Sequence, residues 1–311
     1  MKVMKFGGTS VGSPQRMKSV ATLITDNDRN IVVLSAMSGT TNSLLEIADY
    51  LYKQNLEGAG LCINKLEEKY KAHIDELYST DEYKQKAWLT IHAIFDTIRT
   101  CTKGVFSDKE EKIIVAQGEM MSTNMMTYYL LEKGYKVALI PALEYMRTNE
   151  DCEPDFKYIQ DHLNQQLALH PDAEIIITQG FICLNHAGEI DNLKRGGSDY
   201  TASLVGGAIE ASEIQIWTDI DGMHNNDPRF VPNTTPVGHL HFDEAAELAY
   251  FGAKILHPTC ILPAKYANVP VKLRNTMDPT APGTIISNMI EHRKIKAVAA
   301  KDNIVAINIT S

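Results

Sequence analysis

The sequence predicts an α/β fold with a mainly parallel, doubly wound sheet, because short apolar segments alternate with segments of helical periodicity. The apolar segments are rich in Val and Ile and are almost uninterrupted, which is typical of strands buried on both faces. Six segments have this character: Val3–Phe6, Ile31–Leu34, Lys136–Ile140, Ile175–Thr178, Ile214–Trp217 and Val269–Leu273. Between most of them, apolar residues recur every three or four positions, as on one face of a helix.

The first helix is predicted to begin just after the first strand. Ser13 is a good N-cap and Pro14 fits the first helical position, since its missing N–H would have no partner there anyway. Residues 43–132 then break the alternation of strands and helices. Their apolar periodicity predicts a mostly helical insertion in the N-terminal half, ending in a helix through Met120–Leu131.

The C-terminal part looks like a boundary followed by a new segment. Asp278–Gly283 contains two prolines and a glycine and is predicted to be a turn-rich boundary. Beyond it, Ile304–Thr310 has the composition of a further strand. A lone terminal strand needs a partner, so we expect the chain to be part of a longer protein.

Composition excludes several classes of protein. The 311 residues carry 30 Lys and Arg against 39 Asp and Glu, a net charge of −9, so nucleic acid is not an expected partner. The five cysteines are an odd number without a CxxC pair, which argues against a disulfide framework and a zinc site. No signal peptide and no run of about 20 apolar residues is present, so we expect a soluble, cytoplasmic protein with no membrane partner.

Four loops rich in Gly, Ser and Thr follow predicted strands directly. They are Lys5–Gly12, Ser35–Asn42, Thr178–Phe181 and Thr218–Gly222. In an open parallel sheet, ligands bind at the carboxyl ends of the strands. The sequence therefore predicts one site shared by all four loops.

The first of these loops is a candidate phosphate cradle. Gly7 and Gly8 let backbone N–H groups approach an anion, and the next helix offers its positive N-terminus. The pattern is neither a Walker A loop nor GxGxxG, and a tight turn with a solvated Lys5 is the alternative.

A second glycine-rich turn, Lys194–Asp199, has the same anion-binding character. Arg195 supplies a cation, and Ser198 or Asp199 is predicted to cap the helix that follows. An ordinary capped helix is the alternative. It would use the Ser and Asp without needing the Arg-Gly-Gly.

Acidic residues in the stretch Asp219–Arg229 leave three interpretations open. A cation site is one, but the EF-hand spacing is missing. A nucleotide-binding loop fits the neighbouring phosphate loops better, and a surface turn is the third. Glu119 could simply favour the N-terminus of a helix, and Lys254 could be an ordinary solvated lysine.

Taken together, several motifs resemble the aspartate kinases of the amino-acid-kinase family. The resemblance rests on KFGGTSVG, SAMSGTTN, QGEMMST, RGGSDYTA, WTDIDGMHNNDPR and FGAKILHP, which occur in the family's order across residues 2 to about 258. It implies a three-layer α/β/α sandwich. It also implies ATP-dependent phosphorylation of the side-chain carboxylate of L-aspartate to 4-phospho-L-aspartate, the first step of lysine, threonine and methionine biosynthesis, with Mg²⁺ on the ATP phosphates.

The resemblance also implies roles for individual residues. Lys5 and Asp199 would be catalytic, with Lys5 stabilising the transferring phosphoryl group and Asp199 orienting the lysines and the phosphate cradle. The implied aspartate-binding residues are Ser35, Thr41, Glu119, Arg195 and Ser198. The implied ATP-binding residues are Lys5, Phe6, Gly7, Gly8, Thr9, Thr218, Asp219, His224, Arg229 and Lys254. Direct protein ligands of Mg²⁺ are not identified.

The implied organisation is a catalytic domain over residues 1–290, whose N-terminal half binds aspartate and whose C-terminal half binds ATP. Residues 291–311 would be a linker and the first strand of a truncated ACT regulatory domain. Because the family dimerises mainly through ACT domains, a homodimer of this chain is only an open possibility. His224 departs from the pattern, since the family commonly has Tyr there.

Two alternatives to an aspartate kinase stay open at this point. One is a kinase of the same fold for another acid, such as glutamate or N-acetylglutamate, although Arg195 and Glu119 together favour a free α-amino acid. The other is a catalytically silent sensor of amino acids or nucleotides. Such a sensor would be expected to lose Lys5 or the glycines, and all are present.

Overall fold

The computed structural model describes residues 1–311 except 26–27, 195, 228, 252–255, 292–294 and 301–311. The strands are β1 (Lys2–Phe6), β2 (Asn30–Leu34), β3 (Val137–Leu139), β4 (Ile175–Gln179), β5 (Ile182–Leu184), β6 (Ile190–Asn192), β7 (Glu213–Thr218), β8 (His239–His241), β9 (Val271–Asn275) and β10 (Thr284–Ser287). The α-helices are α1 (Pro14–Ile24), α2 (Thr40–Tyr52), α3 (Leu56–Leu77), α4 (Asp81–Cys101), α5 (Asp108–Glu132), α6 (Phe156–Leu169), α7 (Gly197–Ala208), α8 (Phe242–Tyr250) and α9 (Leu262–Tyr266). Two short 3₁₀ turns, η1 (Ala142–Glu144) and η2 (Pro258–Ile261), complete the described elements.

Within the described ranges, eight strands form one sheet in the order β3-β4-β2-β1-β7-β9-β10-β8. Strands β3, β4, β2, β1, β7 and β9 pair in parallel, and β10 runs antiparallel to β9. In the register of the central strands, Lys5 lies between Val33 of β2 and Ile216 of β7. This pairing puts the carboxyl ends of β1, β2, β4 and β7 at the same edge.

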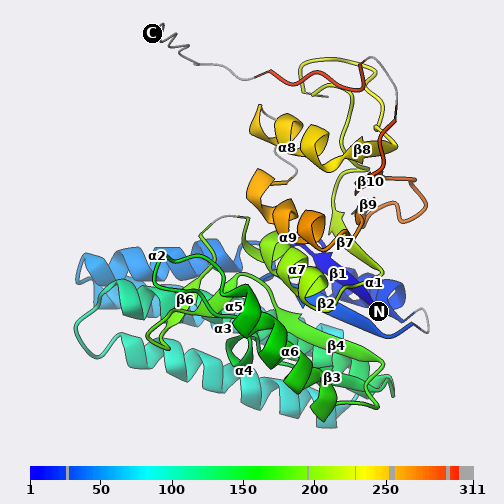
Figure 1. Ribbon diagram of the computed structural model, residues 1–311. Helices are drawn as coiled ribbons and strands as arrows, with labels where there is room; N and C mark the ends of the chain where they lie inside the picture. The colour runs from blue at the N-terminus through cyan, green and yellow to red at the C-terminus, as the bar shows by residue number, and fades with distance from the viewer. Residues whose placement is uncertain (26–27, 195, 228, 252–255, 292–294, 301–311) are drawn as a thin grey trace, which may run out of the picture.

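Helices cover both faces of the sheet, which makes a three-layer α/β/α sandwich (Figure 1). Alternate residues of each strand serve opposite faces, as a pleated strand requires. Met4 and Phe6 pack with α1 and the helices α2–α5, whereas Val3 packs with α6 and α7. The side chain of Lys5 therefore points to the α7 side. The predicted fold class is confirmed.

The predicted strands and helices agree with the structure, with differences in extent. Ser13 caps α1 as expected, with its side chain accepting a hydrogen bond from Arg16 N. The helix expected over Met120–Leu131 begins earlier, at Asp108. Asp278–Gly283 was predicted to be a boundary, and this is wrong. It is the turn between the antiparallel strands β9 and β10 of one sheet. The segment Ile304–Thr310 lies outside the described residues.

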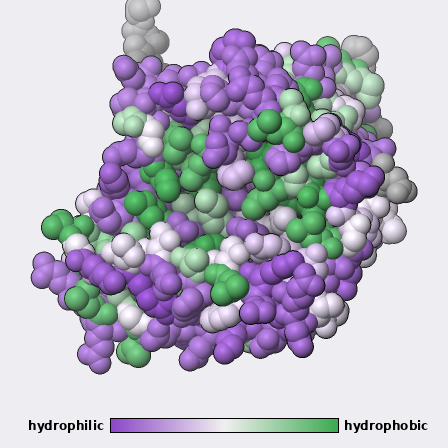
Figure 2. All heavy atoms as spheres, turned by 90° about the horizontal axis from the view of Figure 1, so that it is seen from below, coloured by the Kyte–Doolittle hydropathy of each residue, from purple (hydrophilic) through white to green (hydrophobic). Residues whose placement is uncertain are grey.

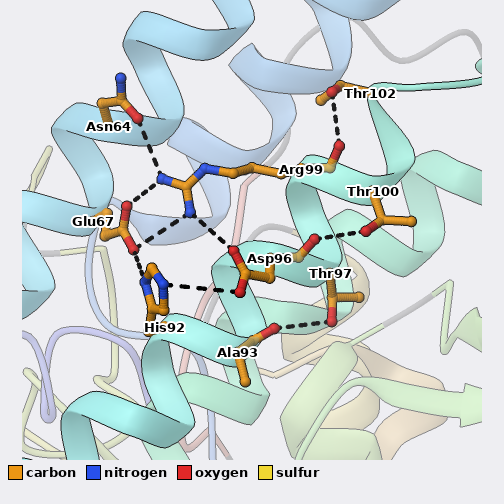
Figure 3. A network of polar contacts seen from close by, with 9 residues as sticks. All are labelled: Asn64, Glu67, His92, Ala93, Asp96, Thr97, Arg99, Thr100 and Thr102. Atoms are coloured by element: carbon orange, nitrogen blue, oxygen red, sulfur yellow. Dashed lines mark hydrogen bonds and ion pairs between the residues drawn. The ribbon is translucent and has the colours of Figure 1, made fainter.

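The predicted insertion is the set of helices α2–α5, seen at the left and bottom of Figure 1. A polar network joins α3 to α4 there (Figure 3). Glu67 of α3, whose side chain is 13% exposed, accepts hydrogen bonds from Arg99 and from His92 Nδ1, the latter at 2.7 Å. Burial alone would raise the pKa of Glu67, but the hydrogen bonds from Arg99 and His92 outweigh it and lower the pKa.

The face at the bottom of Figure 1 is mostly hydrophilic, with apolar side chains gathered across its middle (Figure 2). An open groove of about 480 Å³ lies between α4 and α5, where Leu89 is 62% exposed. This groove shares no residue with the cleft described below. No described helix is long and apolar enough to cross a bilayer.

We predict that Glu67→Gln lowers the free energy of unfolding by about 1 kcal/mol at pH 7, after allowing for solvent screening of this partly exposed site. Because the folded-state pKa of Glu67 lies below its unfolded value, the stabilisation is present at neutral pH. It is lost as the pH falls through the folded pKa. Urea unfolding of the variant and wild type across pH 3–7 measures this.

The matched control is Glu68→Gln, at the exposed neighbouring position. That change should alter stability little at any pH. If Glu67→Gln lowered the free energy of unfolding by the same amount at pH 3 and at pH 7, the electrostatic explanation would be wrong.

Candidate active site

A cleft of about 440 Å³ opens at the carboxyl edge of the sheet. That volume lies within the range of small-molecule sites. The loops after β1, β2 and β4 contribute to it, together with α5 and the starts of α2 and α7. Its lining residues are Gly8, Thr9, Ser35, Ala36, Met37, Ser38, Gly39, Thr41, Asn42, Glu119, Phe181, Gly197 and Ser198. The predicted convergence is therefore present for the first three glycine-rich loops, whereas no residue of the fourth, Thr218–Gly222, lines this cleft.

Two helices begin at this cleft, and both begin without a side-chain cap. Gly39 is the N-cap of α2 and Gly196 is the N-cap of α7. Among described helices of nine residues or more, the others each have a side-chain cap. The first N–H groups of a helix need a partner and carry partial positive charge. The cleft thus offers two sets of backbone donors to an anion.

The backbone turns sharply before α7, and this turn requires glycine at two positions. Gly196 and Gly197 have φ of 67° and 47°, which favour glycine, and a Cβ on Gly196 would lie 1.7 Å from Cys260 Sγ. Directly beside this turn, a Cβ on Gly180 would lie 2.3 Å from Ser198 Oγ, so the glycine lets the end of β4 approach the start of α7. The prediction that Ser198 or Asp199 caps this helix is wrong, since both lie inside its first turn.

Glu119 lies in the middle of α5 rather than at a helix start, so the helix-terminus interpretation of this residue is wrong. Its side chain lines the cleft and the residue is 4% exposed. Oε1 accepts a hydrogen bond from Ala36 N at 3.0 Å, and Oε2 has no partner among the described residues. Burial raises the pKa of Glu119 to about 7, although the hydrogen bond from Ala36 opposes this. A cationic ligand would stabilise the ionised form.

Hydroxyl groups connect the walls of the cleft. Ser35 Oγ donates to Ser198 Oγ at 2.8 Å, which joins the loop after β2 to the start of α7. Ser122 Oγ, one turn after Glu119, donates to the Ser35 carbonyl at 2.8 Å. Thr41 lies in the first turn of α2. The structure thus brings Ser35, Thr41, Glu119 and Ser198 to one cleft.

Lys5 and Asp199 form an ion pair beside this cleft. Lys5 Nζ lies 2.7 Å from Asp199 Oδ1, and the side chains are 12% and 18% exposed. A Cβ on Gly7 would lie 3.4 Å from the same ammonium, so the glycine leaves room next to it. The pair holds a cation at the end of β1, between the cleft and the neighbouring strand β7.

The residues predicted to bind nucleotide are only partly assembled. Thr218 ends β7 and Asp219 follows it, one strand away from Lys5. His224 instead forms hydrogen bonds within its own loop. Its Nε2 lies 2.6 Å from Asp221 Oδ1, and its Nδ1 lies 2.8 Å from Thr234 Oγ1. Arg229 is exposed and pairs with Asp227 at 2.5 Å. Neither side chain reaches the cleft.

Some predicted residues need separate comment. Phe6 is fully buried and its ring stacks on Trp217 at 5.6 Å, so only its backbone is available to a ligand. Thr9 and Gly8 line the cleft. Arg195 and Lys254 lie outside the described residues.

Sequence reasoning did not select seven of the lining residues: Ala36, Met37, Ser38, Gly39, Asn42, Phe181 and Gly197. All seven lie within the glycine-rich loops already singled out. Their position directly after β2 and β4, or in the turn at the start of α7, was the signal that could have selected them.

No group of three or more His, Cys, Asp or Glu side chains suited to a metal ion occurs within the described part of the chain.

The three-layer fold and the glycine-rich strand-end cleft define an α/β protein with a small-molecule site at the carboxyl edge of its sheet. Residues 1–275 match the amino acid kinase family, and the chain belongs to that family. Over 333 residues it is 35% identical to Aspartokinase 3, chloroplastic, of Arabidopsis thaliana, covering 99% of this chain and 57% of that protein. It is 33% identical to Lysine-sensitive aspartokinase 3 of Escherichia coli (strain K12), covering 97% of this chain and 67% of that protein.

Solved structures agree with the sequence comparison. The crystal structure of E. coli aspartokinase III in complex with aspartate and ADP matches with a TM-score of 0.82 and 32% identity, over 94% of this chain and 65% of that one. The chain thus spans about three fifths to two thirds of the length of these relatives.

We predict that Glu119→Gln stabilises the fold at pH 8. The folded-state pKa of about 7 lies above the unfolded value of 4.5, so the buried carboxylate lowers stability as pH rises between them. Removing the charge should raise the free energy of unfolding by an amount on the order of 2–3 kcal/mol at pH 8 and by much less at pH 5. Thermal and urea unfolding at both pH values measure this.

Glu132, on the same helix, provides a contrast of opposite sign. It accepts hydrogen bonds from Ser79 N and Thr80 N at 2.8 Å. Burial would raise the pKa of Glu132, but the hydrogen bonds from Thr80 and Ser79 lower it overall. Glu132→Gln should therefore destabilise at pH 8. If Glu119→Gln and Glu132→Gln both lower the free energy of unfolding at pH 8, the buried charge of Glu119 does not destabilise the fold.

Proposed function

We propose that the protein is an ATP-dependent kinase that phosphorylates the side-chain carboxylate of L-aspartate. The observation that carries this proposal is the pairing of opposite recognition elements in one cleft. Two uncapped helix N-termini suit carboxylates, and the buried Glu119 with its unpartnered oxygen suits an ammonium group. A free acidic amino acid presents both kinds of charge.

The likeness to E. coli aspartokinase III, solved with aspartate and ADP, supports this choice of substrates. In our proposal the N-terminal half binds aspartate, with Ser35, Thr41, Ser198 and Glu119 at the cleft. Arg195 receives the α-carboxylate, where a guanidinium can donate two parallel hydrogen bonds.

The C-terminal half binds ATP in this proposal. Thr218 and Asp219, at the end of β7, are the described residues best placed for it, with Lys254 and Arg229 as further candidates. His224 is bound within its own loop, so a direct contact to nucleotide would require it to leave Asp221 and Thr234.

The chemistry needs no general base. A β-carboxylate with a pKa near 3.9 is ionised at neutral pH, so one of its oxygens can attack the γ-phosphorus directly. A new O–P bond forms, the bond between the γ-phosphorus and the bridging oxygen breaks, and ADP leaves with that electron pair. The obstacle is repulsion between anions, so positioning and charge neutralisation dominate catalysis. Mg²⁺ supplies part of that neutralisation when bound with ATP.

Lys5 provides the protein's own cation for this step. Asp199 holds its ammonium in place at 2.7 Å, and the backbone N–H groups of Gly7 and Gly8 add donors nearby. Lys5 thus supports the phosphoryl oxygens during transfer, whereas Arg195 and Glu119 bind groups of aspartate whose charge does not change.

The direct test of the proposed activity traps the acyl phosphate. Incubation with ATP, Mg²⁺, hydroxylamine and aspartate should yield aspartyl hydroxamate, and glutamate or N-acetylglutamate should yield far less. Hydroxamate from glutamate alone would indicate a kinase for another acid. No hydroxamate from any amino acid would favour a silent sensor.

Steady-state kinetics separate the two cations. Lys5→Ala should mainly lower kcat, by roughly 10²–10³-fold as for loss of a preorganised donor, and Lys5→Arg should not restore it because a broad guanidinium does not replace a compact ammonium. Arg195→Ala should mainly raise the aspartate KM, since it removes binding felt equally in ground and transition states.

Circular dichroism should first establish that each of these variants is folded. If Lys5→Ala keeps the wild-type kcat and changes only the ATP KM, then Lys5 is a nucleotide anchor and the mechanism above is wrong.

A further inference from the structure

Lys69 of α3 touches the loop that forms one wall of the cleft. Its Nζ donates a hydrogen bond to the Ser38 carbonyl at 3.2 Å. A Cβ on the next residue, Gly39, would lie 3.9 Å from the same ammonium. Gly39 is the N-cap of α2 and lines the cleft. The helical insertion therefore brings a cation to the rim of the site, next to a helix N-terminus.

This position is electrostatically unfavourable for a lysine in the absence of ligand. A helix N-terminus carries partial positive charge, so it favours anions and disfavours cations. The first turn of α2 contains no acidic residue, and no side chain caps it. Over the described ranges, Lys69 has no carboxylate within ion-pair distance, whereas many other lysines of the chain do. The uncompensated charge points to an anion that arrives with the substrate.

The same helix also fixes the start of α2. Tyr70, the residue after Lys69, is fully buried, and its hydroxyl hydrogen-bonds Thr40 Oγ1 at 2.9 Å. Thr40 is the first residue of α2. On the other side, Ser38 N donates to the Gly8 carbonyl at 3.1 Å. The ammonium of Lys69 and the N–H groups of α2 are thus held together at one corner of the cleft.

We infer that Lys69 is a positioning residue that raises the affinity of the cleft for the carboxylates of its amino-acid substrate. Its charge adds to the field of the α2 N-terminus, and its hydrogen bond holds the Ser38 carbonyl. The inference rests on the proposed function. Lys69 does not touch the reacting atoms, so its charge acts on substrate binding rather than on phosphoryl transfer.

Substrate kinetics of charge variants test the inference. Lys69→Met should raise the aspartate KM by about three- to tenfold, the size of a partly exposed charge interaction. It should leave the ATP KM unchanged and kcat within about twofold. Lys69→Arg should restore most of the affinity. The difference in aspartate KM between Lys69→Met and the wild type should become smaller at 0.5 M salt, because salt screens exposed charges. The matched control is Lys65→Met, an exposed lysine one turn earlier on α3.

Lys69→Gln separates the charge from the hydrogen bond, since its amide can donate to the Ser38 carbonyl without a charge. A KM like that of Lys69→Met supports the inference, and a wild-type KM overturns it. A lower kcat together with higher KM values for both aspartate and ATP, without rescue by Lys69→Arg, would indicate a merely structural role for Lys69. This result would also overturn the inference. Failure of the proposed function is distinguishable, because it would appear in the wild-type protein as absence of aspartyl hydroxamate.

Discussion

Parallel pairing of β1 with β2 and β7 is the constraint on which the site depends. Because β1 lies at the centre of the sheet, its carboxyl end is flanked by the ends of both neighbours. The pleat sends Lys5 to the face covered by α7, where Asp199 receives it. Glycines at the next positions keep side chains out of that space. The register of the central strands and the packing of α7 on this face therefore bring together a cation, a carboxylate and two glycine-rich loops.

Several features of the cleft lower the stability of the fold. Glu119 is a buried carboxylate, two helices begin without caps, and Lys69 lies beside a helix N-terminus. Within the described part of the chain, one oxygen of Glu119 has no partner, the two helix starts have no side-chain cap, and Lys69 has a hydrogen bond to the Ser38 carbonyl but no carboxylate within ion-pair distance. Two extensive apolar clusters, one on each face of the sheet, offset this instability. The zwitterionic ligand with two carboxylates that the proposed function names would complement these groups.

Site residues could be predicted from the sequence where polar residues and glycines come directly after a strand. Gly8, Ser35 and Thr41 could be predicted as cleft residues, and Lys5 as a cation beside the cleft, since the carboxyl ends of parallel strands converge. Glu119 was misplaced on its helix because the start of α5 was not identified. The capping box at Ser107 and Glu110 was the available signal.

Contacts that depend on tertiary packing could not be predicted. Lys69 and Tyr70 come from a helix whose apolar periodicity reports only its buried face, not which loop lies beside its polar residues. Strands β8 and β10 have three and four residues, too few for a periodic signal. The composition of Asp278–Gly283 predicts a boundary because a turn composition does not distinguish a hairpin connection from a domain junction.

The two halves of the proposed site are connected by buried polar contacts rather than by the sheet alone. Ser10, in the loop after β1, hydrogen-bonds Thr276 Oγ1 at 2.7 Å, although 266 positions separate them. Thr276 N in turn donates to the Thr218 carbonyl at 2.8 Å. Both hydroxyl side chains are buried. Removing either hydroxyl would leave the other buried without a hydrogen-bond partner, which lowers stability more than the loss of an exposed hydrogen bond. The loop after β7, where nucleotide is proposed to bind, is therefore connected through Thr276 to the glycine-rich loop that follows Lys5.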